Sequence, residues 1–272
     1  YADLALDVGL SLQAGQRLWL STPITAAPLA RMIVAAAYKR GARYVEMNWM
    51  DDEMTLARFQ HAPRDSFTEF PVWRSEAMLA GAKEGDAFLS VRGSDPLLLK
   101  DQDAELVTTM QRTGARHSRE YLTYVTSHKV NWCVLSVPIP AWARQVFPGL
   151  SDADAVARLW DAIGAACRLD QPDPVAAWNA HLAELARRAA ELTEAAFTAL
   201  HFVGPGTDLT VGLVQGHRWI GGSSTTDSGI TFTPNVPTEE VFTLPHKDRV
   251  DGTVTASKPL NYGGTLIEGL QV

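Results

Sequence analysis

The stretch QRLWLSTPITAAPLARMIVAAAYKRGARYVEMNW, residues 16–49, decides the fold. It starts with a β-like run at 16–21, continues as a helical pattern at 29–41 and ends in a second β-like run at 42–49. Gly41 stands where a left-handed residue usually ends a helix. A strand, a helix and a second strand in this order predict a crossover unit that joins two parallel strands.

The same alternation continues along the first 198 residues. The next predicted elements are helices at 70–85 and 103–116 and strands at 85–93 and 131–140. Two long helices should follow, one beginning at Ser151 and one with Asp173 as its cap and Pro174 at its first position. The fold class we predict for residues 1–198 is therefore an α/β domain, with a mainly parallel sheet covered by helices.

The pattern of apolar residues along the sequence changes at about residue 199. Helical periodicity stops, and short β-like runs alternate with Gly, Pro, Asn and Asp at the turns. We therefore place a domain boundary near residue 198 and expect a β-rich second domain at 199–272. The chain begins with Tyr1 and ends at Val272 inside an alternating segment. We expect this second domain to be incomplete and the chain to be part of a longer polypeptide.

The bulk composition excludes several classes of protein. The 272 residues are 46% hydrophobic and 20% charged, with a net charge of −7 and no basic stripe, so nucleic acid is not an expected partner. No apolar run approaches the ~20 residues that a membrane helix requires. The two cysteines, Cys133 and Cys167, lie far apart in apolar segments. They predict neither a disulfide framework nor a thiolate zinc site, and they favour a cytoplasmic protein.

An acidic pair interrupts the β-rich part in the sequence PTEEVFTLPH, residues 237–246. Glu239 and Glu240 precede the apolar pair Val241 and Phe242, so the segment resembles a strand that carries a double negative charge. Neighbouring side chains of a strand point to opposite faces, so at most one of the two carboxylates enters a site. The alternation does not choose between them, and an exposed start of a strand is the alternative.

Other candidate motifs have structural explanations. The seven histidines lack the spacing of a zinc-binding pair such as H-E-x-x-H. The segment GPGTD, 204–208, predicts a tight turn rather than a phosphate loop, because the P-loop pattern is absent. The acidic run 51–53 precedes a helical pattern, where carboxylates favour the positive end of the helix. From the residues alone, the sequence predicts an α/β protein with an unexplained acidic pair.

Three segments resemble the M29 family of metallo-aminopeptidases, the thermophilic-type group that includes aminopeptidases T and S. They are HFVGPGTDLTVGL (201–213), PNVPTEEVFTLPH (234–246) and GTVTASKPLNYGGTLIEG (252–269). The first half is similar too, notably at 35–59, so the resemblance spans the whole chain.

The resemblance implies a cytoplasmic, two-domain exopeptidase that works as a homodimer on peptide substrates. It also implies two divalent metal ions, such as zinc, cobalt, manganese or magnesium, held by two glutamates, two histidines and an aspartate. We assign the first metal-binding glutamate to Glu240 and a supporting, structural role to Glu239. The other ligands and the catalytic tyrosine of the family would lie beyond Val272, so this chain contains no catalytic residue of its own. We expect residues 1–272 alone to be inactive.

Two alternatives remain. In the first, the chain is a non-catalytic fragment of such an enzyme, in which residues 1–198 serve as a dimerisation and scaffold module. In the second, it is a nucleotide-using α/β enzyme, which rests on analogy of fold without a glycine fingerprint. We take the metal-dependent aminopeptidase, a hydrolase and protease, as the expected function of the parent protein.

Overall fold

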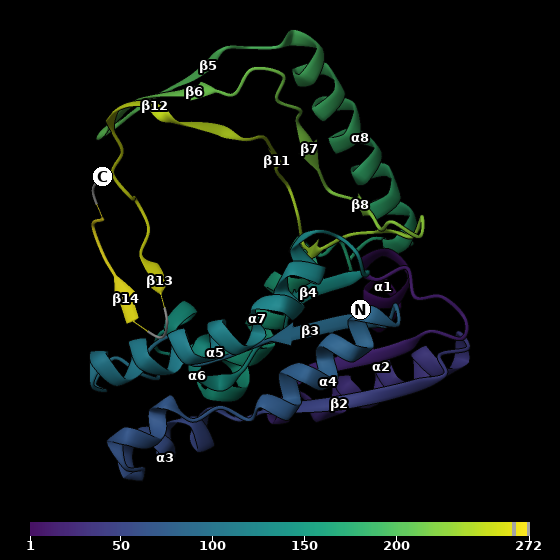
Figure 1. Ribbon diagram of the computed structural model, residues 1–272, viewed down its shortest axis with the longest axis vertical. Helices are drawn as coiled ribbons and strands as arrows, with labels where there is room; N and C mark the ends of the chain where they lie inside the picture. Colours follow the sequence, from purple (N-terminus) through teal and green to yellow (C-terminus); the bar gives the residue numbers. More distant parts are fainter. Residues whose placement is uncertain (263–264, 271–272) are drawn as a thin grey trace.

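The computed structural model describes residues 1–262 and 265–270, and its first part is built on a five-stranded sheet (Figure 1). The strands lie in the order β10-β4-β3-β1-β2, and every neighbouring pair is parallel. They are β1 (Arg17–Pro23), β2 (Tyr44–Met50), β3 (Ala87–Arg92), β4 (Trp132–Ser136) and β10 (Asn235–Val236). The predicted parallel sheet is confirmed. Gly263, Gly264, Gln271 and Val272 of the predicted second domain lie outside the described residues.

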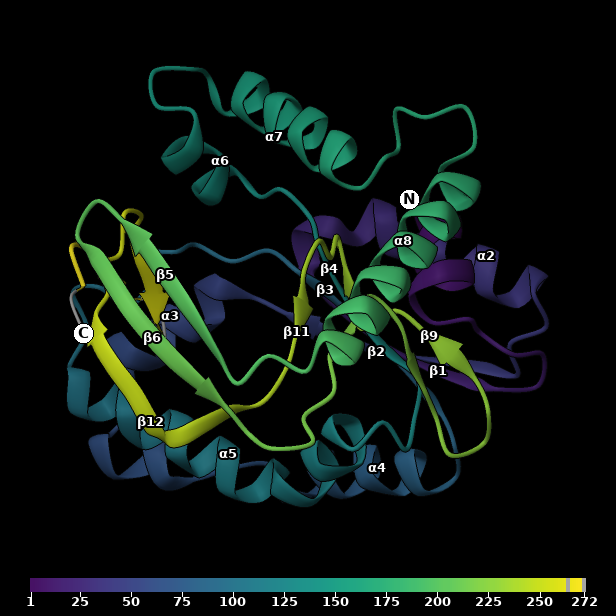
Figure 2. The same ribbon diagram turned by 90° about the horizontal axis from the view of Figure 1, so that it is seen from above.

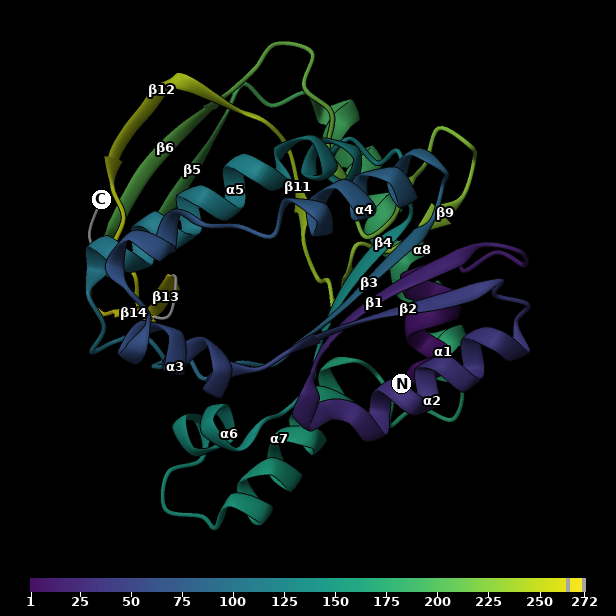
Figure 3. The ribbon, with the colours of Figure 1, turned by 60° about the horizontal axis from the view of Figure 1, so that its bottom comes forward.

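Helices cover both faces of this sheet. Figure 3 shows α4 and α5 on one side of strands β1 to β4, with α1, α2 and α7 on the other. The helices are α1 (Ala2–Leu4) with a π-helical turn (Ala5–Gly9), α2 (Ala27–Lys39), α3 (Asp52–His61), α4 (Val72–Lys83), α5 (Ala104–Thr126), α6 (Pro140–Val146), α7 (Asp152–Ala166) and α8 (Pro174–Ala195). Two 3₁₀ turns, Ile24–Ala26 and Arg64–Thr68, precede α2 and α4.

The two faces of the sheet bury different side chains. Leu20 and Leu89 are at most 1% exposed and belong to the large aliphatic core under α1, α2 and α7. The opposite face carries aromatic side chains: Trp19 stacks on Phe88, which in turn contacts Tyr121 of α5. A parallel sheet covered on both faces needs apolar residues at successive positions, which is why its strands resemble continuous apolar runs.

Capping residues fix where several helices begin. The Asp51 carboxylate accepts hydrogen bonds from the backbone N–H groups of Glu53 and Met54, so the acidic run 51–53 does cap a helix. Asp173 accepts from Ala176 N at 3.0 Å, with Pro174 at the first helical position as predicted. Helix α5 is longer than predicted, because residues beyond 116 pack against the aromatic face of the sheet.

Apart from β10, the described strands after α8 form small antiparallel sheets. Strands β5 (Ala199–Gly204), β6 (Thr207–Leu213) and β12 (Pro245–Thr253) form a three-stranded sheet in the order β12-β6-β5 (Figure 2). Gly206, at a φ of 72°, makes the tight turn between β5 and β6 that the sequence predicts. The remaining pairs are β7 (Ile220–Gly221) with β11 (Val241–Phe242), β8 (Ser224–Thr225) with β9 (Thr231–Phe232), and β13 (Leu260–Tyr262) with β14 (Thr265–Ile267).

One strand from the second half returns to the first sheet. Strand β10 lies parallel to β4, with Asn235 opposite Val134 and Val236 opposite Leu135. Residues beyond 198 thus contribute an edge strand to the sheet of the first part. The domain boundary near residue 198 stays a prediction. No helix of the described residues has the length and apolar character needed to cross a membrane.

Candidate functional site

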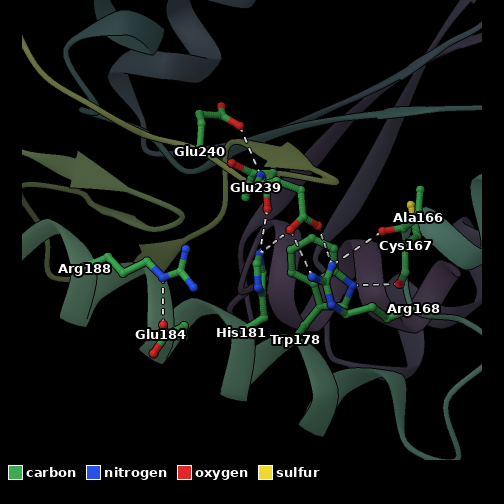
Figure 4. Close-up of polar contacts among 10 residues, drawn as sticks. Ala166, Cys167, Arg168, Trp178, His181, Glu184, Arg188, Glu239 and Glu240 are labelled. Atoms are coloured by element: carbon green, nitrogen blue, oxygen red, sulfur yellow. Dashed lines mark hydrogen bonds and ion pairs between the residues drawn. The ribbon is translucent and has the colours of Figure 1, made fainter. Parts of the chain in front are cut away.

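The acidic pair lies between β10 and β11, rather than inside a strand. Only Val241 and Phe242 form β11, so the strand expected across Glu239 and Glu240 is wrong. The reason is that the backbone carbonyl of Thr238 accepts a hydrogen bond from the His181 side chain instead of a strand neighbour. The two carboxylates nevertheless diverge: Figure 4 shows Glu239 directed at Arg168 and His181, with the Glu240 carboxylate on the other side.

Glu239 is held by two cationic or polar side chains. Arg168 donates two hydrogen bonds to its carboxylate, from Nη1 to Oε1 at 2.8 Å and from Nη2 to Oε2 at 3.1 Å. His181 Nε2 lies 3.3 Å from Oε2 of the same carboxylate. The paired hydrogen bonds from the guanidinium hold the pKa of the Glu239 carboxyl below its ordinary value. Both oxygens of the Glu239 carboxylate are therefore engaged in an ion pair with Arg168.

A buried tryptophan supports the arginine. The Arg168 guanidinium lies 4.7 Å from the centre of the Trp178 ring, which is completely buried. Trp178 Nε1 donates to the carbonyl oxygen of Cys167 at 2.7 Å, so its ring is locked against the end of α7. Cys167 and Trp178 both belong to the large aliphatic core, so the arginine of the ion pair rests on that core.

Glu240 faces a small hollow. It is exposed, and it lines a cavity of about 130 Å³ together with Trp132, His128 and Phe242. Its Oε2 accepts a hydrogen bond from the backbone N–H of Glu239 at 3.1 Å. Within residues 1–262 and 265–270, no cation forms an ion pair with it. Of the two glutamates, Glu240 is the carboxylate that is left available to an incoming group.

The described residues do not make a metal site by themselves. No group of three or more His, Cys, Asp or Glu side chains among them is arranged to hold a metal ion. A carboxylate oxygen has the right chemistry for a divalent cation, but catalytic zinc normally takes three protein ligands. Glu240 supplies one donor, so the donor set of this part of the chain does not fit the two-metal centre that the family resemblance implies.

Sequence patterns did not indicate Arg168 or His181. Arg168 and His181 lie 71 and 58 positions before Glu239 in the sequence. Only the fold brings Arg168 to the Glu239 side chain and His181 to the backbone of Thr238. Of the other histidines, His128 lines the cavity that Glu240 faces, whereas His201 contacts Asp208 in the β5–β6 hairpin. One local signal does exist for Arg168: it directly follows Cys167 at the end of a helix, where glycine is the usual residue.

Comparison with known proteins now decides the family. A sequence model described as thermophilic metalloprotease (M29) matches residues 1–272. The chain belongs to the M29 family. This M29 chain is 45% identical over 269 residues to Aminopeptidase 2 from Geobacillus stearothermophilus, and 45% identical over 269 residues to Aminopeptidase T from Thermus thermophilus. It also matches the solved structure of wild-type AmpT from Thermus thermophilus with a TM-score of 0.93 at 43% identity.

The M29 chain corresponds to only part of these relatives. Each match covers 99% of the chain but 65% of Aminopeptidase 2 and 66% of Aminopeptidase T. The match to the solved structure covers 99% of this chain and 66% of that one. The likeness confirms the family and the predicted fold class, a helix-covered parallel sheet followed by small antiparallel sheets.

Proposed function

We propose that the natural polypeptide carrying residues 1–272 is an aminopeptidase, a hydrolase that releases N-terminal amino acids from peptides. The observation that carries the proposal is the likeness, along 99% of the chain, to relatives named aminopeptidases. The arrangement of the acidic pair supports it, because Glu239 is engaged by Arg168 while Glu240 faces a hollow.

The proposal includes two divalent metal ions, such as zinc, cobalt, manganese or magnesium, in the complete site. Glu240 would contribute one ligand, and Glu239 would support it from the neighbouring position. The remaining ligands are not found among the described residues, so they would come from polypeptide outside them. Such ions supply Lewis acidity and an activated water when bound.

The test is an amino-acid release assay on the natural polypeptide. It should release amino acid from an aminoacyl-p-nitroanilide when Co²⁺, Zn²⁺ or Mg²⁺ is supplied. Glu240→Ala should abolish release, whereas Glu239→Ala should lower it by about 10-fold to 100-fold, as outer partners of a ligand usually do. The opposite ranking of the two variants would contradict the assignment within the pair, and no release with any of the three ions would contradict the activity.

A second candidate function is a non-catalytic dimerisation or scaffold fragment, which the incomplete donor set of the described residues favours. Size-exclusion chromatography with light scattering separates the candidates in part. A homodimer fits either proposal, whereas a strictly monomeric chain of 272 residues would exclude the dimerisation role. A cytoplasmic location is part of both proposals, and fractionation of the source cells would test it.

A further inference from the structure

Arg168 occupies a backbone position that normally belongs to glycine. Its φ is 56°, in the left-handed region. Arg168 N donates to Ala165 O and Leu169 N donates to Gly164 O, the two hydrogen bonds of a Schellman motif at the end of α7. An arginine at this position costs energy that a glycine would avoid. The position therefore suggests that the side chain itself has a role.

The side chain reaches two separate parts of the molecule from this turn. Its guanidinium stacks on Trp178 of α8 and forms the paired hydrogen bonds with Glu239. The Arg168 side chain is 23% exposed and the Glu239 side chain 59% exposed, so the buried partner of the pair is the arginine, which is held against Trp178. A fork of two parallel hydrogen bonds fixes direction as well as distance, which a lysine at this position would not do.

His181 fixes the neighbouring residue independently. Its Nε2 donates to the carbonyl oxygen of Thr238 at 2.8 Å, and its side chain is 15% exposed. Thr238 is itself buried. The main chain at Thr238 and the side chain at Glu239 are thus tied to α8 and to the end of α7 immediately before Glu240.

We propose that Arg168 and His181 are positioning residues that set the direction of the Glu240 carboxylate. The inference rests on the proposed function, in which Glu240 belongs to the active site. One hydrogen bond connects the two glutamates, since Glu239 N donates to Glu240 Oε2. A displacement of Glu239 therefore moves the donor that holds the Glu240 carboxylate. Loss of the Arg168 fork frees Glu239 and lets residue 240 turn away from the cavity.

The experiment compares Arg168→Ala and Arg168→Lys with a matched control, a second arginine that lies on α8. Arg187→Ala is the control, because Arg187 also makes carboxylate pairs but lies on the outer surface of α8, where it contacts Glu184 and Glu191. All variants are made in the natural polypeptide that carries residues 1–272. Two quantities are measured: kcat and KM on an aminoacyl-p-nitroanilide, and hydrogen–deuterium exchange of a peptide that covers residues 236–243.

Arg168→Ala should lower kcat by about 10-fold to 100-fold, the usual cost of misplacing an active-site group, with KM changed by less than about 2-fold. Exchange in 236–243 should accelerate by about 10-fold, while peptides from β1 and β3 keep their wild-type rates. Arg168→Lys should recover part of both effects, and Arg187→Ala should leave both unchanged. His181→Gln, which keeps a side-chain N–H donor, should retain more activity than His181→Ala.

Two results would overturn the inference. One is wild-type kcat and wild-type exchange in Arg168→Ala; the other is faster exchange throughout β1 and β3, which marks a general loss of stability. Failure of the proposed function has a different signature. In that case the wild-type protein releases no amino acid, and the positioning role is contradicted too. Faster exchange of residues 236–243 in Arg168→Ala would then show only that Arg168 holds this segment in place.

Discussion

Asp86 should be among the most costly single carboxylates to remove from the part of the chain that forms the parallel sheet. It lies between α4 and β3 and is 3% exposed. Its Oδ1 accepts from Arg17 Nε at 2.8 Å and its Oδ2 accepts from Trp19 Nε1 at 2.9 Å. Gly81 leaves room for this contact, since a Cβ there would lie 2.5 Å from Oδ2. Asp86→Ala deletes both acceptors at once.

The magnitude follows from the two donors. A hydrogen bond to a charged group contributes about 1.5–3 kcal/mol, and the Trp19 donor loses such a partner inside the protein. The Arg17 side chain is 37% exposed and can turn to water, so its share is discounted to about 0–1 kcal/mol. Together the loss is about 2–4 kcal/mol of unfolding free energy. At roughly 2–4 °C per kcal/mol for a chain of this size, Tm should fall by roughly 5–15 °C.

Thermal unfolding followed by circular dichroism measures this shift. Asp86→Asn should lower Tm by about half as much, since an amide oxygen still accepts one hydrogen bond but carries no charge. Asp152→Ala is the control, because Asp152 pairs with Arg144 at the surface and both side chains are more than half exposed. It should change stability by less than about 0.5 kcal/mol. An Asp86→Ala protein that melts within about 1 °C of wild type, or no lower than the control, would refute the reasoning.

Two further predictions concern the aliphatic core and the thiols. Leu89→Ala should destabilise the protein by about 2–5 kcal/mol in chemical denaturation, because Leu89 is 1% exposed in a central strand, whereas Leu244→Ala, at 65% exposure, should stay within about 0.5 kcal/mol. Burial raises the pKa of the Cys133 and Cys167 thiols. A raised pKa keeps the unreactive thiol form as pH increases through 8, so neither should react with a disulfide reagent in the native protein and both should react in denaturant. Rapid labelling of the folded protein at about pH 8 would contradict this.

Much of the fold was predictable because its signals are local. The cap at Asp173 with Pro174 after it, and the acidic run that starts at Asp51, identify helix starts within a few residues of sequence. Helix α5 was underestimated because Gly114 and a polar stretch weaken its local pattern. Contacts such as that of Tyr121 with Phe88 stabilise its second half, and they join residues far apart in the chain.

The site was predictable only in part, for the same physical reason. The motif locates Glu239 and Glu240, but the alternation of a strand cannot tell which carboxylate is engaged. That distinction comes from Arg168 and His181, which the fold alone brings to the acidic pair. His181 also explains why β11 starts only at Val241, because its side chain, and not a strand neighbour, satisfies the Thr238 carbonyl group.

Strand β10, which lies just before the acidic pair, anchors that segment to the parallel sheet. Thr233 N donates to Gly9 O and Val134 N donates to Pro234 O, both at 2.8 Å, and Val236 is 2% exposed in the aliphatic core. The segment is therefore fixed to the sheet at Val236 and to α7 and α8 at Thr238 and Glu239, and β11 after Glu240 pairs with β7. A carboxylate held on rigid elements at both ends keeps its direction better than one on a free loop. The parallel sheet, the end of α7 and α8 thus hold in place the segment of the second half of the chain that carries Glu240.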